Sequence, residues 1–164
     1  MALLDILEYP DPRLRLAAAP VTEFDADLDR LVDDLLETMY AGKAIGLCAQ
    51  QASDLRQVIV MDLSPDASAP QVYINPQIVS GSRPGMVEES CLSVPGVVAS
   101  VARKTRIAVR ARGRDGREFE RDLEGMDAVC LQHEMDHLDG VLFVDRLSWM
   151  RRQLLRWSQS RAPA

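Results

Sequence analysis

The segment GMDAVCLQHEMDHLDG, residues 125–140, decides the fold that this sequence predicts. Apolar residues recur on two opposite faces of a helix drawn through residues 125–138, and Asp139 followed by Gly140 ends it. A surface helix is apolar on one face, whereas a helix that is apolar on both sides is buried. The sequence therefore predicts a central helix with the rest of the chain arranged around it.

The remaining segments alternate between strands and helices. Strands are predicted at 57–63, 71–80, 106–112 and 117–122, and helices at 12–17, from Asp25 to Gly42, and at about 148–159. Asp115-Gly116 joins the last two strands, and Asp-Gly between alternating segments is typical of a β-hairpin. The expected class is α+β, with mainly antiparallel sheets surrounding the central helix and with a C-terminal helix.

Length and composition limit the kind of protein. A chain of 164 residues suits a single domain over residues 1–164. Its apolar runs are shorter than the roughly 20 residues that cross a bilayer, and its first residues carry acids where a signal peptide carries lysine or arginine. Three cysteines without close spacing fit a reducing compartment. These features predict a soluble, cytoplasmic protein without a membrane partner.

The central helix carries an H-E-x-x-H motif, His133-Glu134-Met135-Asp136-His137. Side chains four residues apart share one helix face, so both imidazoles can reach one metal ion with Glu134 beside it. The alternative is two histidines that fall four apart by chance. Against it, the chain has only two histidines, and two buried imidazoles without partners are costly. The motif therefore predicts a metal site.

A catalytic metal site needs a third protein ligand and an open position for water. The residues alone favour Cys91 only modestly, from its strand-to-turn context in residues 88–96. Cys48 and Cys130 lie in apolar surroundings, where a free cysteine is usually a small buried hydrophobic residue.

Three blocks of sequence together resemble the peptide deformylase family. They are AIGLCAQQ at 44–51, ESCLS at 89–93 and QHEMDH at 132–137, and ILEYPDPRLR at 6–15 resembles the start of the family's chains. Order, spacing and total length agree, so the resemblance covers essentially the whole chain.

The resemblance implies removal of the N-formyl group from the N-terminal methionine of nascent polypeptides by water activated on one divalent metal. The implied metal ligands are Cys91, His133 and His137, and the implied catalytic groups are Glu134, as base and then acid, the side-chain amide of Gln51 and the backbone N–H of Leu92. Fe²⁺ is the implied physiological metal, and Zn²⁺, Ni²⁺ or Co²⁺ also suit one thiolate and two imidazoles.

The resemblance also implies a set of substrate contacts. Ile45 and Ser90 would pair with an extended substrate backbone, next to Gly46 of the same block. The methionine pocket would be formed by Ala44, Val87, Met126, Val129 and Cys130. The helix pattern alone places the last three beside the histidines, and without the family it favours ordinary core packing for Met126 and Val129.

Charged neighbours are expected to support the metal ligands. A metal-bound histidine usually donates its second N–H to a carboxylate or carbonyl, and Glu89 is a candidate acceptor. Asp136 lies on the buried helix and needs a cation, for which we predict Arg103. The alternative for Asp136 is a solvated acid.

Five positions differ from the family pattern. Lys43 stands where an acid is usual, Val98 where an arginine is usual, Ala44 and Ser90 where glycine is usual, and Cys48 in place of the usual small residue before Ala49. These changes leave two other functions open: hydrolysis of another acyl-peptide or amide, and metal-dependent peptide binding without turnover. The presence of Glu134 and Gln51 argues against the second.

The end of the chain is basic. Residues 146–164 contain five arginines and no acid, so the net charge of −6 combines an acidic body with a basic tail; the arginines are Arg146, Arg151, Arg152, Arg156 and Arg161. The residues alone favour a solvated cationic helix. The resemblance implies docking on ribosomal RNA. The expected partners are therefore the formylated nascent peptide and the ribosome, not DNA.

Overall fold

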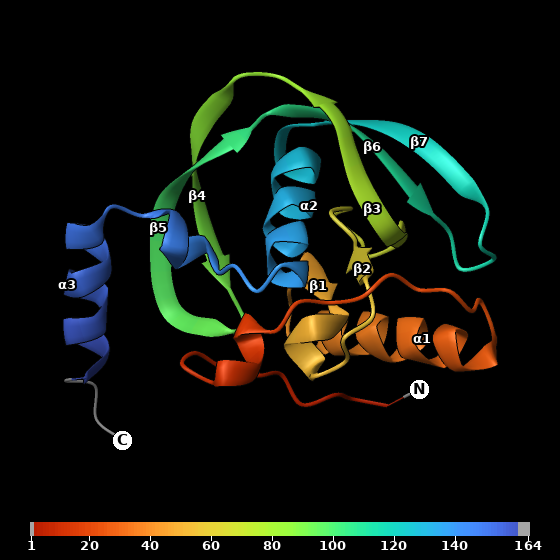
Figure 1. Ribbon diagram of the computed structural model, residues 1–164, viewed down its shortest axis with the longest axis horizontal. Helices are drawn as coiled ribbons and strands as arrows, with labels where there is room; N and C mark the ends of the chain where they lie inside the picture. The colour runs from red at the N-terminus through yellow and green to blue at the C-terminus, as the bar shows by residue number, and fades with distance from the viewer. Residues whose placement is uncertain (1, 161–164) are drawn as a thin grey trace.

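The computed structural model describes residues 2–160, with side chains described as far as residue 154 (Figure 1). At its centre lies helix α2, Gly125–Leu138, which begins after Glu124 and ends at Asp139. Nine of its residues are buried, including His133, Glu134 and His137. Strands enclose the helix on several sides (Figure 1). The predicted central helix is confirmed, with the bounds that the sequence indicated.

Two antiparallel sheets surround α2. The five-stranded sheet has the order β1-β2-β3-β6-β7, formed by Gly46–Cys48, Val58–Met61, Gln71–Gly81, Arg106–Arg112 and Glu118–Glu124. The two-stranded sheet pairs β4, Pro84–Cys91, with β5, Val94–Lys104. The predicted hairpin is confirmed, since β6 and β7 pair antiparallel with Arg112 opposite Glu118. The α+β class is therefore confirmed.

The sequence did not predict β1 or β5, and of β4 it indicated only the strand-to-turn end near Cys91. Charged side chains that point inward disguise the alternation of β4 and β5, because Glu89 and Arg103 are both buried. Pro95 and Gly96 interrupt the apolar pattern near the start of β5. These strands form a hairpin whose turn, Leu92-Ser93, lies between the paired residues Cys91 and Val94.

The helices outside the centre lie where the sequence predicts them, but the first is shorter than predicted. Helix α1, Ala26–Ala41, starts at Asp25, whose side chain accepts from the Leu28 N–H. The first predicted helix is only a 3-10 turn, η1 (Pro12–Arg15), because Leu16 is already extended. Two further 3-10 turns, η2 (Ala49–Ala52) and η3 (Phe143–Arg146), flank the centre.

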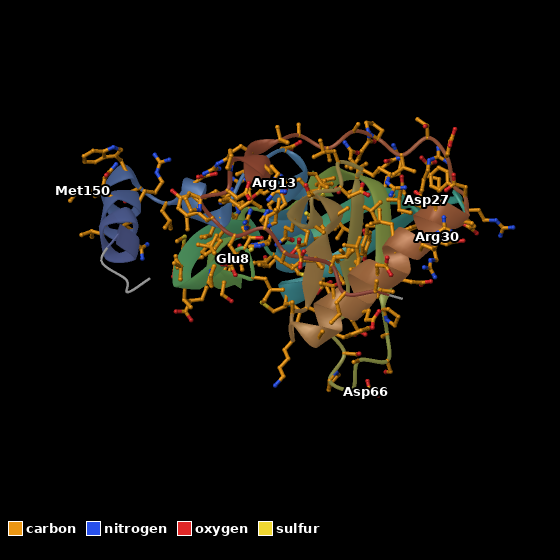
Figure 2. All side chains as sticks on the ribbon, turned by 90° about the horizontal axis from the view of Figure 1, so that it is seen from below. Glu8, Arg13, Asp27, Arg30, Asp66 and Met150 are labelled. Atoms are coloured by element: carbon orange, nitrogen blue, oxygen red, sulfur yellow. The ribbon has the colours of Figure 1, made fainter. Side chains whose placement is uncertain are left out.

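The C-terminal helix α3, Trp149–Ser160, projects from the rest of the molecule (Figure 1). Figure 2 shows Met150 on this projecting element, with its side chain away from the sheets. Among the side chains of α3 that the structure describes, those of Trp149, Met150 and Leu154 are large, apolar and more than 60% exposed. Within the described residues, none of the helices combines the length and the apolar character needed to span a bilayer.

Candidate metal centre and active site

Helix α2 and the β4–β5 hairpin bring three ligand atoms together. His133 and His137 lie one turn apart on α2, with their Nε2 atoms 3.3 Å from each other. Cys91, at the end of β4, places Sγ 3.3 Å from His137 Nε2. The ligand atoms of all three residues lie within 4.8 Å of one another. The four-residue spacing on the helix predicted that the two histidines lie together. Cys91 is brought next to them by its place beside the turn of the β4–β5 hairpin.

The chemistry of this donor set fits a single cation. A proton can satisfy only part of two facing imidazole nitrogens and a thiol, whereas a tetrahedral metal accepts all three. Burial and the charges of His133 and Arg103 lower the pKa of His137 well below its usual value, so this imidazole stays neutral. Burial alone lowers the pKa of His133, but contacts with Cys91 and Glu89 outweigh it and raise the pKa to about 10. The environment of His133 therefore attracts positive charge.

Buried charges fix the orientation of His133. Its Nδ1 lies 2.7 Å from Glu89 Oε1, which leaves Nε2 facing the other ligands. Arg103 donates two hydrogen bonds to Glu89 and one, of 2.6 Å, to Asp136. Burial alone raises the pKa of Glu89, but the hydrogen bonds from Arg103 and His133 outweigh it and lower the pKa to about 2. The predicted contacts of Glu89 with a histidine and of Arg103 with Asp136 are confirmed.

Glu134 is a buried carboxyl beside the ligands. Among the described side chains, its Oε2 atom has no hydrogen-bond partner. Burial raises the pKa of Glu134 to about 7. A carboxyl group that is half ionised at neutral pH can both accept and release a proton, which is the property of a general base that later acts as an acid.

Gln51 points its amide nitrogen at Cys91, one of the three candidate ligands. Its Oε1 accepts from the Cys48 backbone N–H at 3.1 Å, which fixes the orientation of the amide. Nε2 then lies 3.0 Å from Ser93 Oγ and 3.5 Å from Cys91 Sγ. Ser93, which the sequence did not single out, thus holds Gln51 from the turn that also carries Leu92.

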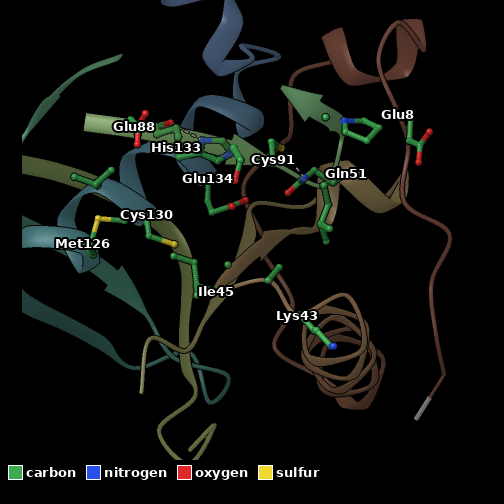
Figure 3. Close-up of a pocket in the computed structure, with 18 residues that line it drawn as sticks. Glu8, Lys43, Ile45, Gln51, Glu88, Cys91, Met126, Cys130, His133 and Glu134 are labelled. Atoms are coloured by element: carbon green, nitrogen blue, oxygen red, sulfur yellow. Dashed lines mark hydrogen bonds and ion pairs between the residues drawn. The ribbon is translucent and has the colours of Figure 1, made fainter. Parts of the chain in front are cut away.

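These groups border one cavity of about 650 Å³ (Figure 3). Its lining contains most of the residues predicted as site residues: Ala44, Ile45, Gly46, Gln51, Ser90, Cys91, Leu92, Met126, Val129, Cys130, His133 and Glu134. His137 lies behind them, almost fully buried. Met126 is 48% exposed, so it borders the cavity rather than filling the core that the helix pattern alone favoured. Neither Val87 nor Val98 lines the cavity, although the structure describes the side chains of both.

The mouth of the cavity carries charges that the motifs did not indicate. Glu8 and Glu88 line it together with Lys43, whose backbone has a φ of 54°. In the view of Figure 3, Glu88 lies at the upper left beside His133, Glu8 lies at the upper right and Lys43 lies below them. Glu8 comes from the N-terminal segment, where sequence alone gives no sign that a residue so distant reaches the site.

Comparisons with known proteins agree with this geometry. The sequence model of the family described as polypeptide deformylase matches residues 3–153. A peptide deformylase of Chromobacterium violaceum is 49% identical, with 95% of this chain and 93% of that protein covered. One from Alkalilimnicola ehrlichii is 52% identical, over 95% of this chain and 88% of that protein.

Solved structures give the same result. A peptide deformylase from Legionella pneumophila superposes with a TM-score of 0.91 at 41% identity, over 99% of this chain and 100% of that one. A peptide deformylase from Ehrlichia chaffeensis in complex with actinonin also reaches 0.91, at 35% identity, over 99% of this chain and 100% of that chain. The chain therefore belongs to the peptide deformylase family and is a hydrolase of that type.

Proposed function

We propose that the protein hydrolyses the N-formyl group of methionine at the start of nascent polypeptides, and that it does so with one divalent metal held by Cys91, His133 and His137. The observation that carries this proposal is the meeting, at one cavity, of three convergent candidate ligands with the buried carboxyl of Glu134, whose Oε2 has no hydrogen-bond partner among the described side chains. The family supports deformylation as the reaction.

A bound divalent ion would act as a Lewis acid and would bring the pKa of a coordinated water to roughly 7. We expect Fe²⁺ as the physiological metal, with Zn²⁺, Ni²⁺ or Co²⁺ as substitutes, because one thiolate and two imidazoles suit all four. The contact of His133 Nδ1 with Glu89 leaves Nε2 available, so that His133 would hold the ion through this nitrogen.

Glu134 moves the protons of the reaction. Its carboxylate takes a proton from the attacking water and passes it to the amine nitrogen when the C–N bond breaks, so that formate and a free amino terminus are the products. The Oε2 of Glu134, without a hydrogen-bond partner among the described side chains, and its pKa of about 7 suit both directions of transfer.

Gln51 and Leu92 stabilise the negative charge that develops on the formyl oxygen. The Gln51 amide is oriented before substrate arrives, because Cys48 and Ser93 occupy its oxygen and one of its N–H groups. We assign the second donor to the Leu92 backbone N–H, in the turn directly after Cys91. Fixed donors of this kind lower the barrier without reorganisation during the reaction.

The walls of the cavity suit an extended peptide with an apolar first side chain. We propose that the backbone runs between Ile45 of the segment before β1 and Ser90 of β4, both accessible at the cavity. Met126, Val129 and Cys130 offer an apolar surface for the methionine side chain, beside Ala44 and Gly46. Val87 does not line the cavity, so we assign its predicted role to these neighbours.

Turnover of formyl-methionyl peptides by metal-loaded protein, measured beside Glu134→Ala, tests the proposal. We expect formate release that the variant loses. Activity equal to that of the variant would refute deformylation. Turnover of acetylated peptides or other amides instead would establish a different acyl specificity, and tight peptide binding without turnover would establish a binding module.

We further propose that the protein acts in the cytoplasm, where nascent chains emerge, and that its C-terminal helix docks on ribosomal RNA. Arg151 and Arg152 lie on α3, which projects from the molecule (Figure 1). The side chains of Arg156 and Arg161 lie outside the described part of the chain. A solvated helix without a partner is the competing interpretation.

A further inference from the structure

We infer that Arg146 is a positioning residue for the metal ligand His133, to which it is connected through Asp136, Arg103 and Glu89. This inference rests on the metal centre of the proposed function, but not on the identity of the reaction. Sequence alone groups Arg146 with the basic tail, whereas in the structure Arg146 lies in the 3-10 turn η3 and pairs with Asp136 of helix α2.

The connection consists of short contacts between alternating charges. Arg146 donates from Nε and Nη2 to both oxygens of Asp136, at 2.7 Å each. Asp136 Oδ2 also accepts from Arg103 Nη1 at 2.6 Å. Arg103 holds Glu89 with two further hydrogen bonds, and Glu89 accepts from His133 Nδ1. The contacts between arginine and carboxylate are charge-assisted hydrogen bonds. The last contact joins the Glu89 carboxylate to the imidazole of His133.

Arg146 is the most solvent-exposed of the four charged residues in this series of contacts. The Arg103 and Glu89 side chains are only 2% and 5% exposed, and that of Asp136 is 13% exposed, while that of Arg146 is 45% exposed. Two carboxylates, Glu89 and Asp136, contact the buried guanidinium of Arg103. Arg146 supplies the second positive charge and so keeps Asp136 directed toward Arg103 rather than toward water.

The 3-10 turn that carries Arg146 supports His133 a second time. Phe143, in the same turn, packs its ring 5.8 Å from the His133 ring, centroid to centroid. The turn is itself anchored, because Asp145 accepts from the Leu142 N–H and pairs with Arg15. One short element, η3, thus bears on the metal ligand by direct packing and through the chain of charges.

Release of Co²⁺ from loaded protein to excess chelator tests this inference, followed by the visible absorption of the cobalt–thiolate site. Removing the direct partner of a metal-bound histidine usually costs about 10–100-fold in metal affinity, so we expect roughly three- to tenfold faster release from Arg146→Ala, which acts at a greater distance. Arg151→Ala, which removes an exposed arginine of the same tail, should release Co²⁺ at the wild-type rate.

A double-mutant cycle with Asp136→Asn shows whether Arg146 acts through Asp136. In that background Arg146→Ala should change the release rate little. A full additional effect would refute the pathway, and so would wild-type release from the single Arg146→Ala variant, even if the melting temperature of the metal-free protein fell. A wild-type protein that binds Co²⁺ but releases no formate would contradict only the deformylase reaction. Failure to bind Co²⁺ would contradict the metal centre and this inference together.

Discussion

At the residue scale, Gln51 is the proposed side-chain donor to the formyl oxygen. We predict that Gln51→Glu lowers kcat about 10²–10³-fold, because it replaces an N–H donor to the developing oxyanion by a carboxylate oxygen. Formate release under saturating peptide measures the loss. Gln77→Glu, an equal change at an exposed position of β3, should keep wild-type kcat. A Gln51→Glu variant within twofold of wild type would exclude the amide from the reaction.

Lys43 is the residue most suited to change which peptides are preferred. It lines the mouth of the cavity together with the acids Glu8 and Glu88. Exposed charge pairs contribute about 0.2–1 kcal/mol, so we predict that Lys43→Glu shifts the kcat/KM ratio of acidic to basic peptides roughly two- to fivefold toward basic ones. Peptides that differ only at the second and third positions measure this ratio.

The shift should shrink at high salt, because screening weakens interactions between exposed charges. Val98→Arg serves as the comparison, since Val98 is 63% exposed but does not line the cavity. An unchanged ratio in Lys43→Glu would show that Lys43 does not contact the substrate chain.

At the level of elements, strand β1 approaches helix α2 so closely that the side chain at position 46 must be absent. A Cβ on Gly46 would lie 2.6 Å from Cys130 Sγ and 3.2 Å from Glu134 Oε1. We predict that Gly46→Ala lowers the free energy of unfolding by about 1–3 kcal/mol, the usual cost of overpacking. Turnover should fall as well, because the displaced group is the carboxyl that we propose as the proton carrier, Glu134, or its neighbour Cys130.

Chemical denaturation and formate release measure the two effects of Gly46→Ala. Cys130→Ala in the same chain should recover part of the stability, since it removes the nearest atom. Gly85→Ala is the control, because a Cβ there meets only Thr105 Cγ2 at 3.6 Å. Equal stability of the Gly46→Ala and Gly85→Ala variants would argue against the close approach.

The loop after β2 is tied to helix α1 by a buried acid. Tyr40 donates to Asp62 at 2.6 Å, and Ser64 and the Ala69 N–H donate to the same carboxylate. Burial alone raises the pKa of Asp62, but these hydrogen bonds outweigh it and lower the pKa. The contribution of Asp62 to stability is therefore full above its unfolded pKa of about 3.9 and is lost as the pH falls through the lower folded value.

Asp62→Asn should accordingly be less stable than wild type at pH 7 and should lose less stability on acidification below about pH 4. Urea unfolding at several pH values measures both differences. Asp122→Asn, at an exposed position of β7, is the control. If the stability of Asp62→Asn fell as steeply with acid as that of wild type, the contacts of Asp62 would not be the cause.

The sequence predicted those helices and strands whose apolar residues keep one periodicity along the whole element. Helix α2 has apolar faces and a clear stop, so its bounds were predicted as they stand. Strands β4 and β5 were missed because their inward residues include Glu89 and Arg103, which only tertiary pairing makes tolerable. The contact of Asp136 with Arg103 could be predicted from the need of a buried acid for a cation.

The contact of Arg146 with Asp136 could not be predicted, because nothing local distinguishes Arg146 from the other arginines of the tail. The lining of the cavity mouth by Glu8 depends likewise on how the N-terminal segment crosses the molecule. Both cases require the three-dimensional path of the chain, which a pattern of period 2 or 3.6 does not contain.

For the molecule as a whole, the question is whether the basic end and the metal centre act separately. A chain that ends after Leu147 keeps Arg146 and its contact with Asp136, but lacks α3. We predict that this truncation preserves peptide turnover and weakens cosedimentation with ribosomes, most clearly at low salt, because phosphate contacts depend steeply on ionic strength.

Arg146→Ala in the full chain should have the opposite effect, because it alters the contacts of the candidate metal centre and leaves α3 in place. It should retain cosedimentation, since the arginines of α3 remain, while it releases metal faster. If the truncated chain cosedimented as well as the full chain, α3 would not be the docking element. If truncation after Leu147 accelerated Co²⁺ release as much as Arg146→Ala does, the projecting helix itself would be needed to hold η3 against the central helix, and the two functions would be coupled.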